Sequence, residues 1–468
     1  MIKNFWHNKI KILNFFTKIK FFFMSKFIIN WGKKLSWEVK ISWSKNAALP
    51  ILCATVLHKW KTILKNIPNI ADIHTLIKIL EFLGAKIKFE KNILEIDNSN
   101  LENKFIPIEL VHSLRWAILL LWPLLARFWK AEMAQPWWCV IWKRPADAHL
   151  NAFKDMWCEI LESEQNLRLA VKEKSENCKL TMSEISVTWT ENALCFASSR
   201  GFCEISMCAS EPHVQDLCHF LEKLWIEIEW IWSHCLKIKW FSENCLINAT
   251  RTVWASASSA ASELNNFQKN KTIEHEIIPD YLEVWTFAIA AAITWWNLKI
   301  KWANEWDLDA FWLKMSEAWV KFTHSENEVE IFENNPENFK AVKIHTAVFP
   351  SFPTDLQAPF AILQTMAKWK SEIFETLFER RLNFLFELEK MWCEMEIQNP
   401  HQAIIHWWKQ LKWCEVTSCD LRAWAAVVLA WLIAKWETTV LNVKYIDRWY
   451  DNFEEKLKKI WADIKRVD

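Results

Sequence analysis

The chain passes from a helix-like segment into a strand-like one at Leu83-Gly84-Ala85-Lys86-Ile87. The pattern is an apolar residue, a pivot, a small or apolar residue, a polar residue and an apolar residue. It recurs at Met156-Trp157-Cys158-Glu159-Ile160, Leu224-Trp225-Ile226-Glu227-Ile228, Ala318-Trp319-Val320-Lys321-Phe322, Met391-Trp392-Cys393-Glu394-Met395 and Ile460-Trp461-Ala462-Asp463-Ile464. Such a pattern is typical of a helix that ends and turns at once into a strand, and its pivot needs left-handed backbone geometry.

The pivot is Gly at the first of these turns and Trp at the others. Gly adopts left-handed geometry without strain, whereas a residue with a Cβ costs roughly 1–2 kcal/mol there. The chain has 35 Trp and 3 Gly, together about 8% of its residues, close to the roughly 7% that Gly occupies in ordinary proteins. We therefore predict that most Trp stand for Gly, through a UGA codon that the source organism reads as Gly. The alternative is a chain that packs all these indoles as core aromatics.

The pivots define a repeat of roughly 70 residues that occurs six times. In the first repeat, residues 72–80 are apolar at helical spacing, and residues 86–89 alternate like a strand. One interval is longer because of a segment at about 244–271, rich in Ser, Ala, Asn and Lys, which we predict to be a surface insertion. Six such modules favour two globular domains of three modules each.

Charge and cysteine content narrow the class of protein. The 57 basic and 56 acidic residues are spread through the chain, so no basic stripe indicates nucleic acid. The 13 Cys are scattered without CxxC pairs, which favours a reducing cytoplasm and no metal site. No apolar run reaches membrane-spanning length once Trp is read as Gly. Residues 1–23 mix Phe and Ile with Lys, and we expect Met24 to be the native start.

Two segments in the first third can carry chemistry. Residues 42–50 become a Gly-containing loop that presents Lys45 and Asn46 before a helix, which suits an anion; the alternative is a solvated Lys on a turn. Residues 136–139 become Pro-Gly-Gly-Cys, a loop tipped by Cys139, with Arg144 five residues later. A thiol near Arg can have its pKa lowered and act as an acid or nucleophile, although most single Cys are inert.

Further candidates lie in the last third. Thr354 or Asp355 begins the helix that runs through residues 361–363, where an N-cap is the simpler interpretation. Arg groups occur at Arg380-Arg381, Asp420-Leu421-Arg422 and Asp447-Arg448, and ordinary salt bridges would explain each of them. Together with Lys45 they suit a ligand that carries both phosphate and carboxylate. No phosphate-loop or dinucleotide pattern is present, so we expect no cofactor.

This constellation resembles the UDP-N-acetylglucosamine 1-carboxyvinyltransferase family of enolpyruvyl transferases, from about Met24 to Asp468. The resemblance rests on Ser44 to Pro50, Leu114-Arg115, Pro136 to Cys139, Arg144-Pro145, Ser186 to Asn192, Phe352 to Asp355, Asp420 to Ala423 and Ile446 to Tyr450. Where the family pattern has Gly, this chain almost always has Trp. Departures are Glu184 in place of a common Lys, Tyr281 in place of a common Arg, and the insertion after Asn244.

The resemblance implies an α/β fold, the inside-out α/β barrel of two domains, each built from three βαβαββ units. It implies a discontinuous first domain, residues 24–44 plus 279–468, and a second domain, residues 45–278, that carries the Cys139 loop. Substrates of the family bind in the cleft between the domains. The resemblance says nothing of oligomeric state, although a monomer is plausible.

The implied reaction moves the enolpyruvyl group of phosphoenolpyruvate to the 3′-hydroxyl of UDP-N-acetylglucosamine and releases phosphate, the first committed step of peptidoglycan synthesis. Cys139 would donate the proton and form a covalent adduct, and Asp355 would serve the attacking hydroxyl. The implied phosphate ligands are Lys45, Arg144 and Arg448, and those of the carboxylate are Arg381 and Arg422, with Asn46 beside them. The implied contacts of the nucleotide sugar are Arg115, Arg144, Pro145, Ala146, Asp147, Ala148, Ser186, Val187, Asp355 and Leu377.

Two alternatives stay open at this point. One is the enolpyruvyl transferase that acts on shikimate 3-phosphate, which lacks a Pro-Gly-Gly-Cys loop. The other is a non-catalytic paralogue that binds a UDP-sugar as a regulator. The presence of all the charged and thiol positions argues against this alternative. Literal Trp residues at 137 and 138 would stiffen the Cys139 loop, and the chain as printed would then be inactive.

Overall fold

The computed structural model describes most of the chain, in several segments. The described residues are 26–30, 37–113, 115–134, 158–162, 166–172, 177–199, 201–240, 272–303, 309–379, 381–407, 411–412, 414, 416–417, 423–434, 438–441, 443–448, 450–460 and 462–467. The predictions for residues 1–23, for the insertion at 244–271 and for the pivots Trp157 and Trp461 lie outside them.

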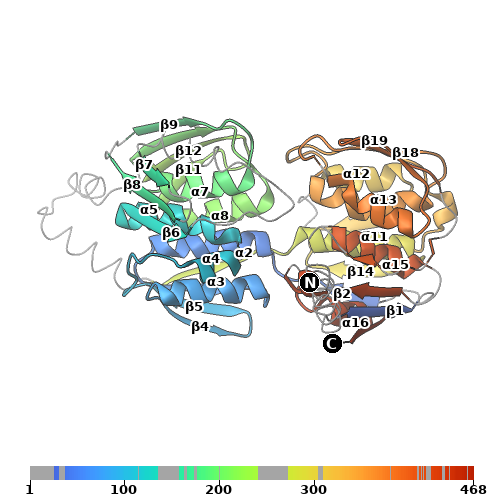
Figure 1. Ribbon diagram of the computed structural model, residues 1–468, viewed down its shortest axis with the longest axis horizontal. Coiled ribbons are helices and arrows are strands. Elements are labelled where there is room, and N and C mark those ends of the chain that lie inside the picture. Colours follow the sequence, from blue (N-terminus) through green and yellow to red (C-terminus); the bar gives the residue numbers. More distant parts are fainter. Residues whose placement is uncertain are drawn as a thin grey trace, which may run out of the picture. The chain divides into compact units, whose positions relative to one another are not determined.

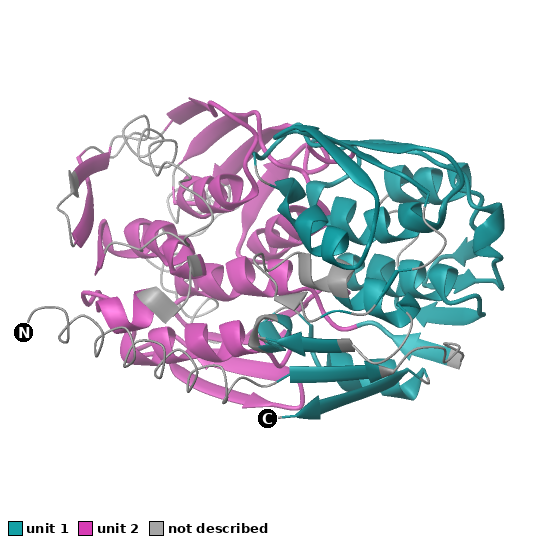
Figure 2. Cartoon of the chain, turned by 45° about the vertical axis from the view of Figure 1, so that its right-hand side comes forward, with its two compact units in different colours: residues 1–41, 281–347, 351–468 teal, residues 42–280, 348–350 magenta. Residues whose placement is uncertain are grey.

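The chain divides into two compact units, which Figure 2 distinguishes by colour. Unit 1 consists of Met1–Ile41, Tyr281–Ala347 and Ser351–Asp468. Unit 2 consists of Ser42–Asp280 and Val348–Pro350.

One module of unit 2 shows the repeating topology in full. Its elements follow in the order β9 (Asn177–Thr181), α7 (Val187–Ala197), β10 (Phe202–Ser206), α8 (Pro212–Lys223), β11 (Ile226–Glu229) and β12 (Cys235–Trp240). The strands are arranged β11-β12-β10-β9. Strand β10 pairs parallel with β9 and antiparallel with β12. A helix joins the parallel strands and a tight turn joins the last two, as their geometry requires, so the module is a βαβαββ unit.

The other sheets of unit 2 follow the same plan. One is ordered β13-β3-β5-β4 and another β6-β8-β7, where Ile106 adds a parallel bridge to Met133. Their strands are β3 (Lys61–Lys65), β4 (Lys86–Glu90), β5 (Ile93–Asp97), β6 (Lys130–Ala134), β7 (Cys158–Glu162), β8 (Asn166–Val171) and β13 (Ile273–Glu276). The remaining helices of the unit are α2 (Lys45–Ala54), α3 (Ala71–Phe82), α4 (Ile108–Ser113) and α5 (Leu121–Phe128), with 3-10 turns η1 (Thr55–Leu57) and η2 (Arg115–Leu120).

Unit 1 contains three sheets of the same kind among its described residues, ordered β21-β22-β1-β23, β15-β16-β14-β2 and β17-β18-β20-β19. Their strands are β1 (Lys26–Asn30), β2 (Trp37–Lys40), β14 (Leu298–Lys301), β15 (Phe322–Ser325), β16 (Glu328–Ile331), β17 (Lys343–His345), β18 (Ser371–Phe374), β19 (Met395–Asn399), β20 (Gln402–Ile405), β21 (Val416–Thr417), β22 (Thr438–Leu441) and β23 (Asp463–Val467). Its helices are α11 (Tyr281–Ile293), α12 (Asp309–Glu317), α13 (Gln357–Met366), α14 (Phe384–Lys390), α15 (Ala423–Ile433) and α16 (Phe453–Lys459), with 3-10 turns η4 (Pro336–Asn338), η5 (Thr354–Leu356), η6 (Arg381–Asn383) and η7 (Val443–Arg448). The prediction of an inside-out α/β barrel, with three βαβαββ modules in each half, is confirmed.

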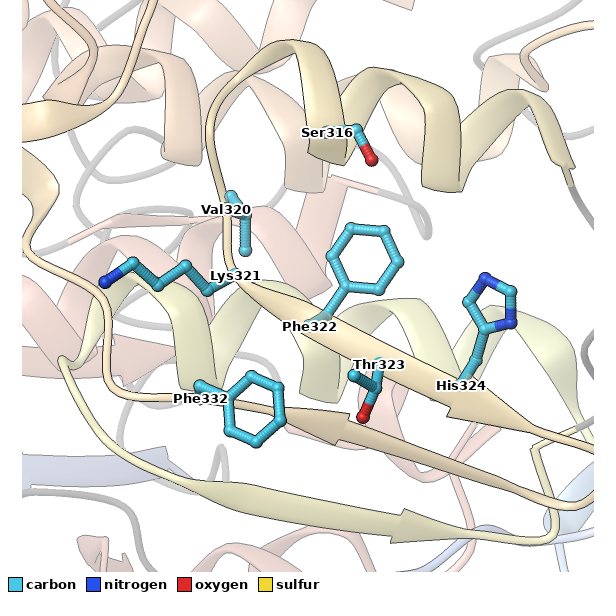
Figure 3. Close-up of a pocket in the computed structure, with 7 residues that line it drawn as sticks. All are labelled: Ser316, Val320, Lys321, Phe322, Thr323, His324 and Phe332. Carbon is cyan, nitrogen blue, oxygen red and sulfur yellow. The ribbon is translucent and has the colours of Figure 1, made fainter.

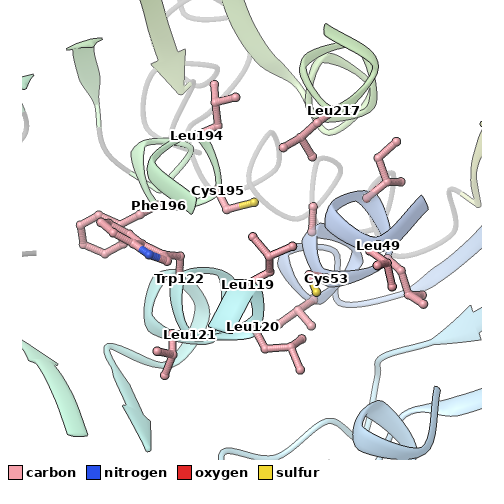
Figure 4. Close-up of a cluster of buried hydrophobic side chains, with 14 of the residues drawn as sticks. Leu49, Cys53, Leu119, Leu120, Leu121, Trp122, Leu194, Cys195, Phe196 and Leu217 are labelled. Carbon is pink, nitrogen blue, oxygen red and sulfur yellow. The ribbon is translucent and has the colours of Figure 1, made fainter. Parts of the chain in front are cut away.

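Helices fill the interior of each unit, and the sheets lie outside them (Figure 1). In unit 1, twelve of the thirteen residues of α11 are buried, Tyr281 and residues 283–293. A helix that is apolar all round is stable only where other elements surround it. In unit 2, side chains of η2, α2, α5, α7 and α8 meet in one apolar cluster, shown in Figure 4. Two Cys, Cys53 and Cys195, pack there as small hydrophobes.

The described pivots adopt the predicted left-handed geometry. Gly84 has φ 105°, and Trp225, Trp319 and Trp392 have φ 67°, 63° and 69°. After Trp319 and Trp392 the next residue donates its N–H to the helix carbonyl oxygen five residues back, as in a Schellman turn. Val320 donates to Met315, and Cys393 donates to Leu388. A Cβ at Gly84 would lie 2.5 Å from the carbonyl oxygen of Asn100. The turn thus demands Gly at residue 84, and the same backbone recurs with Trp.

Within the described residues, no helix is long and apolar enough to cross a membrane. The cysteines of the described segments are all free, and eight of the ten are buried.

Candidate active site

Helix α2 carries two predicted site residues in its first turn. Ser44 is its N-cap, and the Ser44 Oγ accepts the N–H of Ala47 at 3.3 Å. The prediction that Lys45 and Asn46 lie in a loop before the helix is wrong, because the extended backbone of Ser44 starts the helix at Lys45. Both residues therefore stand at the positive end of α2.

Lys45 forms a buried ion pair with Asp72. The Lys45 Nζ lies 2.7 Å from Asp72 Oδ2, and the two side chains are 2% and 3% exposed. Asp72 lies in the first turn of α3, on the buried face that includes Leu76 and Leu80. Sequence reasoning gave Asp72 no role, although a carboxylate at the head of an apolar helical stripe is a usable signal. The Lys45 side chain is thus fixed against Asp72 in a position shielded from water.

Asn46 and Ser186, two predicted substrate contacts, each lie at the start of a helix. The side-chain oxygen of Asn46 is buried and accepts no hydrogen bond from any described residue. Ser186 occupies the N-cap position of α7, before Val187, but its side chain caps nothing. The first N–H groups of a helix need acceptors, and a ligand can supply them. Both features fit the predicted contacts of a polar substrate.

Glu191 and Asn192, inside α7, are buried polar residues with no assigned role. Neither the carboxyl oxygens of Glu191 nor the amide of Asn192 has a hydrogen-bond partner among the described residues. Burial, and then the charge of Glu211, raises the pKa of Glu191 well above its usual value. Burial thus favours the neutral form of the Glu191 carboxyl group.

Several predicted site residues lie outside the described residues. They are Cys139, Arg144, Pro145, Ala146, Asp147, Ala148 and Arg422. Arg115 opens η2, but nothing is described of its side chain. Their roles stay predictions.

In unit 1, the structure brings Asp355 and Arg381 together. Arg381 Nη2 donates to Asp355 Oδ1 at 3.0 Å, and the side chains are 4% and 20% exposed. The simpler interpretation of Asp355 as a helix cap is wrong, because Leu356 holds the N-cap position of α13 and no side chain caps that helix. Asp355 lies in η5 and keeps part of its carboxylate accessible.

Glu375 connects this pair to the loop that carries Leu377. The Glu375 Oε2 accepts hydrogen bonds from Thr354 Oγ1 and Gln357 Nε2, both at 2.6 Å. Its Oε1 accepts the N–H groups of Leu377 at 2.8 Å and Phe378 at 3.0 Å. Sequence reasoning missed Glu375, because nothing in the sequence distinguishes it from a solvated Glu at the end of a strand.

Leu377 and Arg448 are the other predicted contacts in unit 1. The Leu377 side chain is 37% exposed, although its backbone is fixed by Glu375. Arg448 ends η7 and is half-buried. Its neighbour Asp447 receives two hydrogen bonds from Arg466, at 2.7 and 2.9 Å, which anchor this turn to β23.

A surface pocket of about 640 Å³ lies elsewhere in unit 1, between α12 and β15 (Figure 3). None of the predicted substrate contacts lines it. Its residues are Ser316, Val320, Lys321, Phe322, Thr323, His324 and Phe332. No group of three or more metal-binding side chains occurs in the part of the chain that the structure describes.

Comparison with known proteins agrees with the fold. The family model described as EPSP synthase (3-phosphoshikimate 1-carboxyvinyltransferase) matches residues 29–262 and 242–457. Among solved structures, the enolpyruvyl transferase NikO from Streptomyces tendae superposes with a TM-score of 0.80 at 19% identity, over 95% of this chain and 99% of that one. EPSP synthase from Acinetobacter baumannii superposes with a TM-score of 0.67 at 13% identity, over 95% of this chain and 100% of that one. The fold is therefore that of the enolpyruvyl transferases.

Closer relatives share the sequence itself. Proteins named UDP-N-acetylglucosamine 1-carboxyvinyltransferase are 34% identical in Coxiella burnetii, over 95% of this chain and 96% of theirs, and 33% identical in Hydrogenovibrio crunogenus, over 95% and 100%. A protein of the same name from Haemophilus ducreyi is 34% identical over 95% of this chain and 98% of its own length. The chain belongs to the UDP-N-acetylglucosamine 1-carboxyvinyltransferase family.

Proposed function

We propose that this chain transfers the enolpyruvyl group of phosphoenolpyruvate to the 3′-hydroxyl of UDP-N-acetylglucosamine, with release of phosphate. The observation that carries the proposal is the 34% identity along 95% of the chain to proteins named for this activity. The reaction would supply the first committed step of peptidoglycan synthesis. Free, mostly buried cysteines suit a reducing compartment, which supports a cytoplasmic location.

The chemistry divides into an addition and an elimination. In the addition, the 3′-oxygen attacks C2 of phosphoenolpyruvate and loses its proton to a base, while an acid protonates the methylene carbon C3. In the elimination, C3 gives up a proton, the double bond returns and phosphate leaves. Such a sequence needs a base, an acid and fixed cations.

The residues are assigned to these tasks as follows. Asp355, whose carboxylate is oriented by Arg381, serves the attacking hydroxyl, and Cys139 protonates C3. Lys45, Arg144 and Arg448 hold the phosphate, and Arg381 and Arg422 hold the carboxylate beside Asn46. Ser186 and Val187, at the uncapped start of α7, and Leu377 contact the nucleotide sugar, as do Arg115, Pro145, Ala146, Asp147 and Ala148.

A phosphate-release assay tests the proposal. It is run on the chain as printed and on a form with Gly at the left-handed Trp positions and at 137 and 138. We expect phosphate release with UDP-N-acetylglucosamine, and a product heavier by one enolpyruvyl group. Turnover with shikimate 3-phosphate instead, or binding of the UDP-sugar without turnover in either form, would contradict it. All later variants belong in the form that turns over.

A further inference from the structure

We infer that Glu375 is a positioning residue that fixes Asp355, Leu377 and Arg381 relative to one another. The inference rests on the proposed function, because it assumes that these three residues meet the substrates. Glu375 itself is fully buried and is not a catalytic residue.

The carboxylate of Glu375 is saturated by donors from two segments. Thr354, in η5, and Gln357, the first residue of α13, donate to Oε2, and the N–H groups of Leu377 and Phe378 donate to Oε1 from the loop after β18. A buried carboxylate is tolerated only when hydrogen bonds replace its hydration, and bonds to a charged acceptor are short and strong. The distances of 2.6 to 3.0 Å are those of such bonds.

The backbone of Glu375 is fixed independently of its side chain. Its N–H donates to the carbonyl oxygen of His401 at 2.7 Å, and its own carbonyl oxygen accepts from His401 Nδ1 at 2.7 Å. The next residue, Thr376, donates its N–H to Thr346 Oγ1 at 3.1 Å. The carboxylate therefore projects from an anchored point, and the groups bound to it take their positions from it.

The contacts close into a ring around the predicted site. Glu375 holds Phe378, and the Phe378 ring lies 5.2 Å from the guanidinium carbon of Arg381. Arg381 binds Asp355, and the residue before Asp355 is Thr354, which returns to Glu375. A misplacement of about 1 Å can cost roughly a hundredfold in rate, so removal of this one charge should disturb base, guanidinium and sugar contact together.

The test compares Glu375→Gln with a swapped pair. In Glu375→Gln, the new amide faces the Gln357 amide, donor against donor, and we expect kcat/KM for UDP-N-acetylglucosamine to fall by roughly ten- to a hundredfold. The double variant Glu375→Gln with Gln357→Glu restores donor and acceptor with the roles exchanged. We expect it to recover to within about threefold of the parent. If Glu375 served only stability, the double variant would recover Tm but would not recover kcat/KM.

Ser371→Ala is the matched control, because Ser371 donates a buried 2.6 Å bond to Gln364 in the same unit, and neither residue belongs to the ring. It should lower Tm and leave kcat/KM unchanged. Turnover of Glu375→Gln at the parental rate would overturn the inference. A double variant that folds but stays inactive would also overturn it. The double variant tests the inference even if Glu375→Gln unfolds. Asp355→Ala tests the proposed function separately. Normal turnover of Asp355→Ala would refute the role of Asp355. Loss of turnover in Asp355→Ala, together with unaffected turnover in Glu375→Gln, would refute only the positioning role of Glu375.

Discussion

The Nζ of Lys45 lies 2.7 Å from Oδ2 of Asp72, with both side chains withdrawn from water. The positive end of α2 opposes an ammonium at its first residue. A buried ammonium without a counter-charge would be neutralised or displaced. An ammonium has three N–H donors, so it can bind a phosphate oxygen as well as a carboxylate. Asp72 thus provides the counter-charge that fixes Lys45, the proposed phosphate ligand.

We therefore expect Asp72→Asn to raise the KM for phosphoenolpyruvate roughly tenfold, a loss of about 1.4 kcal/mol. The KM for UDP-N-acetylglucosamine should change little, and steady-state kinetics with each substrate varied in turn measure both. Asp216→Asn is the control, because Asp216 forms a comparably buried 2.9 Å pair with His275. It should lower Tm without changing either KM. An unchanged KM for phosphoenolpyruvate in Asp72→Asn would refute this account of Lys45.

The sequence predicted the modules but not these side-chain partnerships, and the reason is physical. A helix that turns directly into a strand leaves a local signature at each pivot, such as Trp319, and six signatures define six modules. The pairing of Asp72 with Lys45, or of Glu375 with Thr354, depends on tertiary packing between segments more than 20 residues apart. Charged residues of these types are most often solvated, so composition and spacing alone assigned Asp72 and Glu375 no role.

The pH dependence of stability should contain a contribution from His58. Burial, and then the charge of Arg127, lowers the pKa of His58 from 6.5 to about 4 in the folded chain. Between these values the unfolded chain takes up a proton that the folded chain does not. The contribution of His58 to folding is therefore present above pH 6.5 and is lost as the pH falls toward 4.

We expect His58→Gln to reduce the difference in unfolding free energy between pH 7.5 and pH 5, as measured by urea denaturation at both. His219→Gln is the control, since the His219 side chain on α8 is 44% exposed, beside Glu222 and the Trp232 ring. A pH slope in His58→Gln equal to that of the parent would show that His58 does not titrate in this way.

Alkylation should single out Cys139. Burial raises the pKa of Cys53 and Cys218 well above the usual value, and that of Cys208 and Cys393 to about 12. Only the thiolate reacts, so these buried thiols are protected. We expect the epoxide phosphonate fosfomycin to modify Cys139 alone, and Cys139→Asp to turn over without being modified. Peptide mass spectrometry reads out the position, and modification of the Cys139→Asp chain would contradict the role of Cys139.

The left-handed positions make the prediction of Gly specific to individual residues. Thirteen non-glycine residues in the described segments have positive φ; three are Asn, which tolerates it, and eight are Trp. The Trp positions are Trp129, Trp225, Trp230, Trp295, Trp302, Trp319, Trp369 and Trp392. Seven of the eight are at least 40% exposed, and Trp369 is 79% exposed. Their indoles pack little, apart from contacts such as Lys340 over Trp319 and Lys412 over Trp392, each 3.5 Å from the ring centroid.

Replacement of all eight by Gly should therefore raise Tm, and replacement by Ala should raise it less. Both sets remove the indoles and their cation–π contacts equally, but Ala keeps the Cβ, which costs about 1 kcal/mol at each left-handed site. The difference between the two sets isolates the backbone term, and thermal unfolding by circular dichroism measures it. If the Tm of the Gly variant were no higher than that of the Ala variant, the argument from backbone geometry would be wrong. Peptide masses of the protein from its own host give the independent answer: we expect Gly at these eight positions, because the backbone at each is left-handed and favours a residue without a side chain.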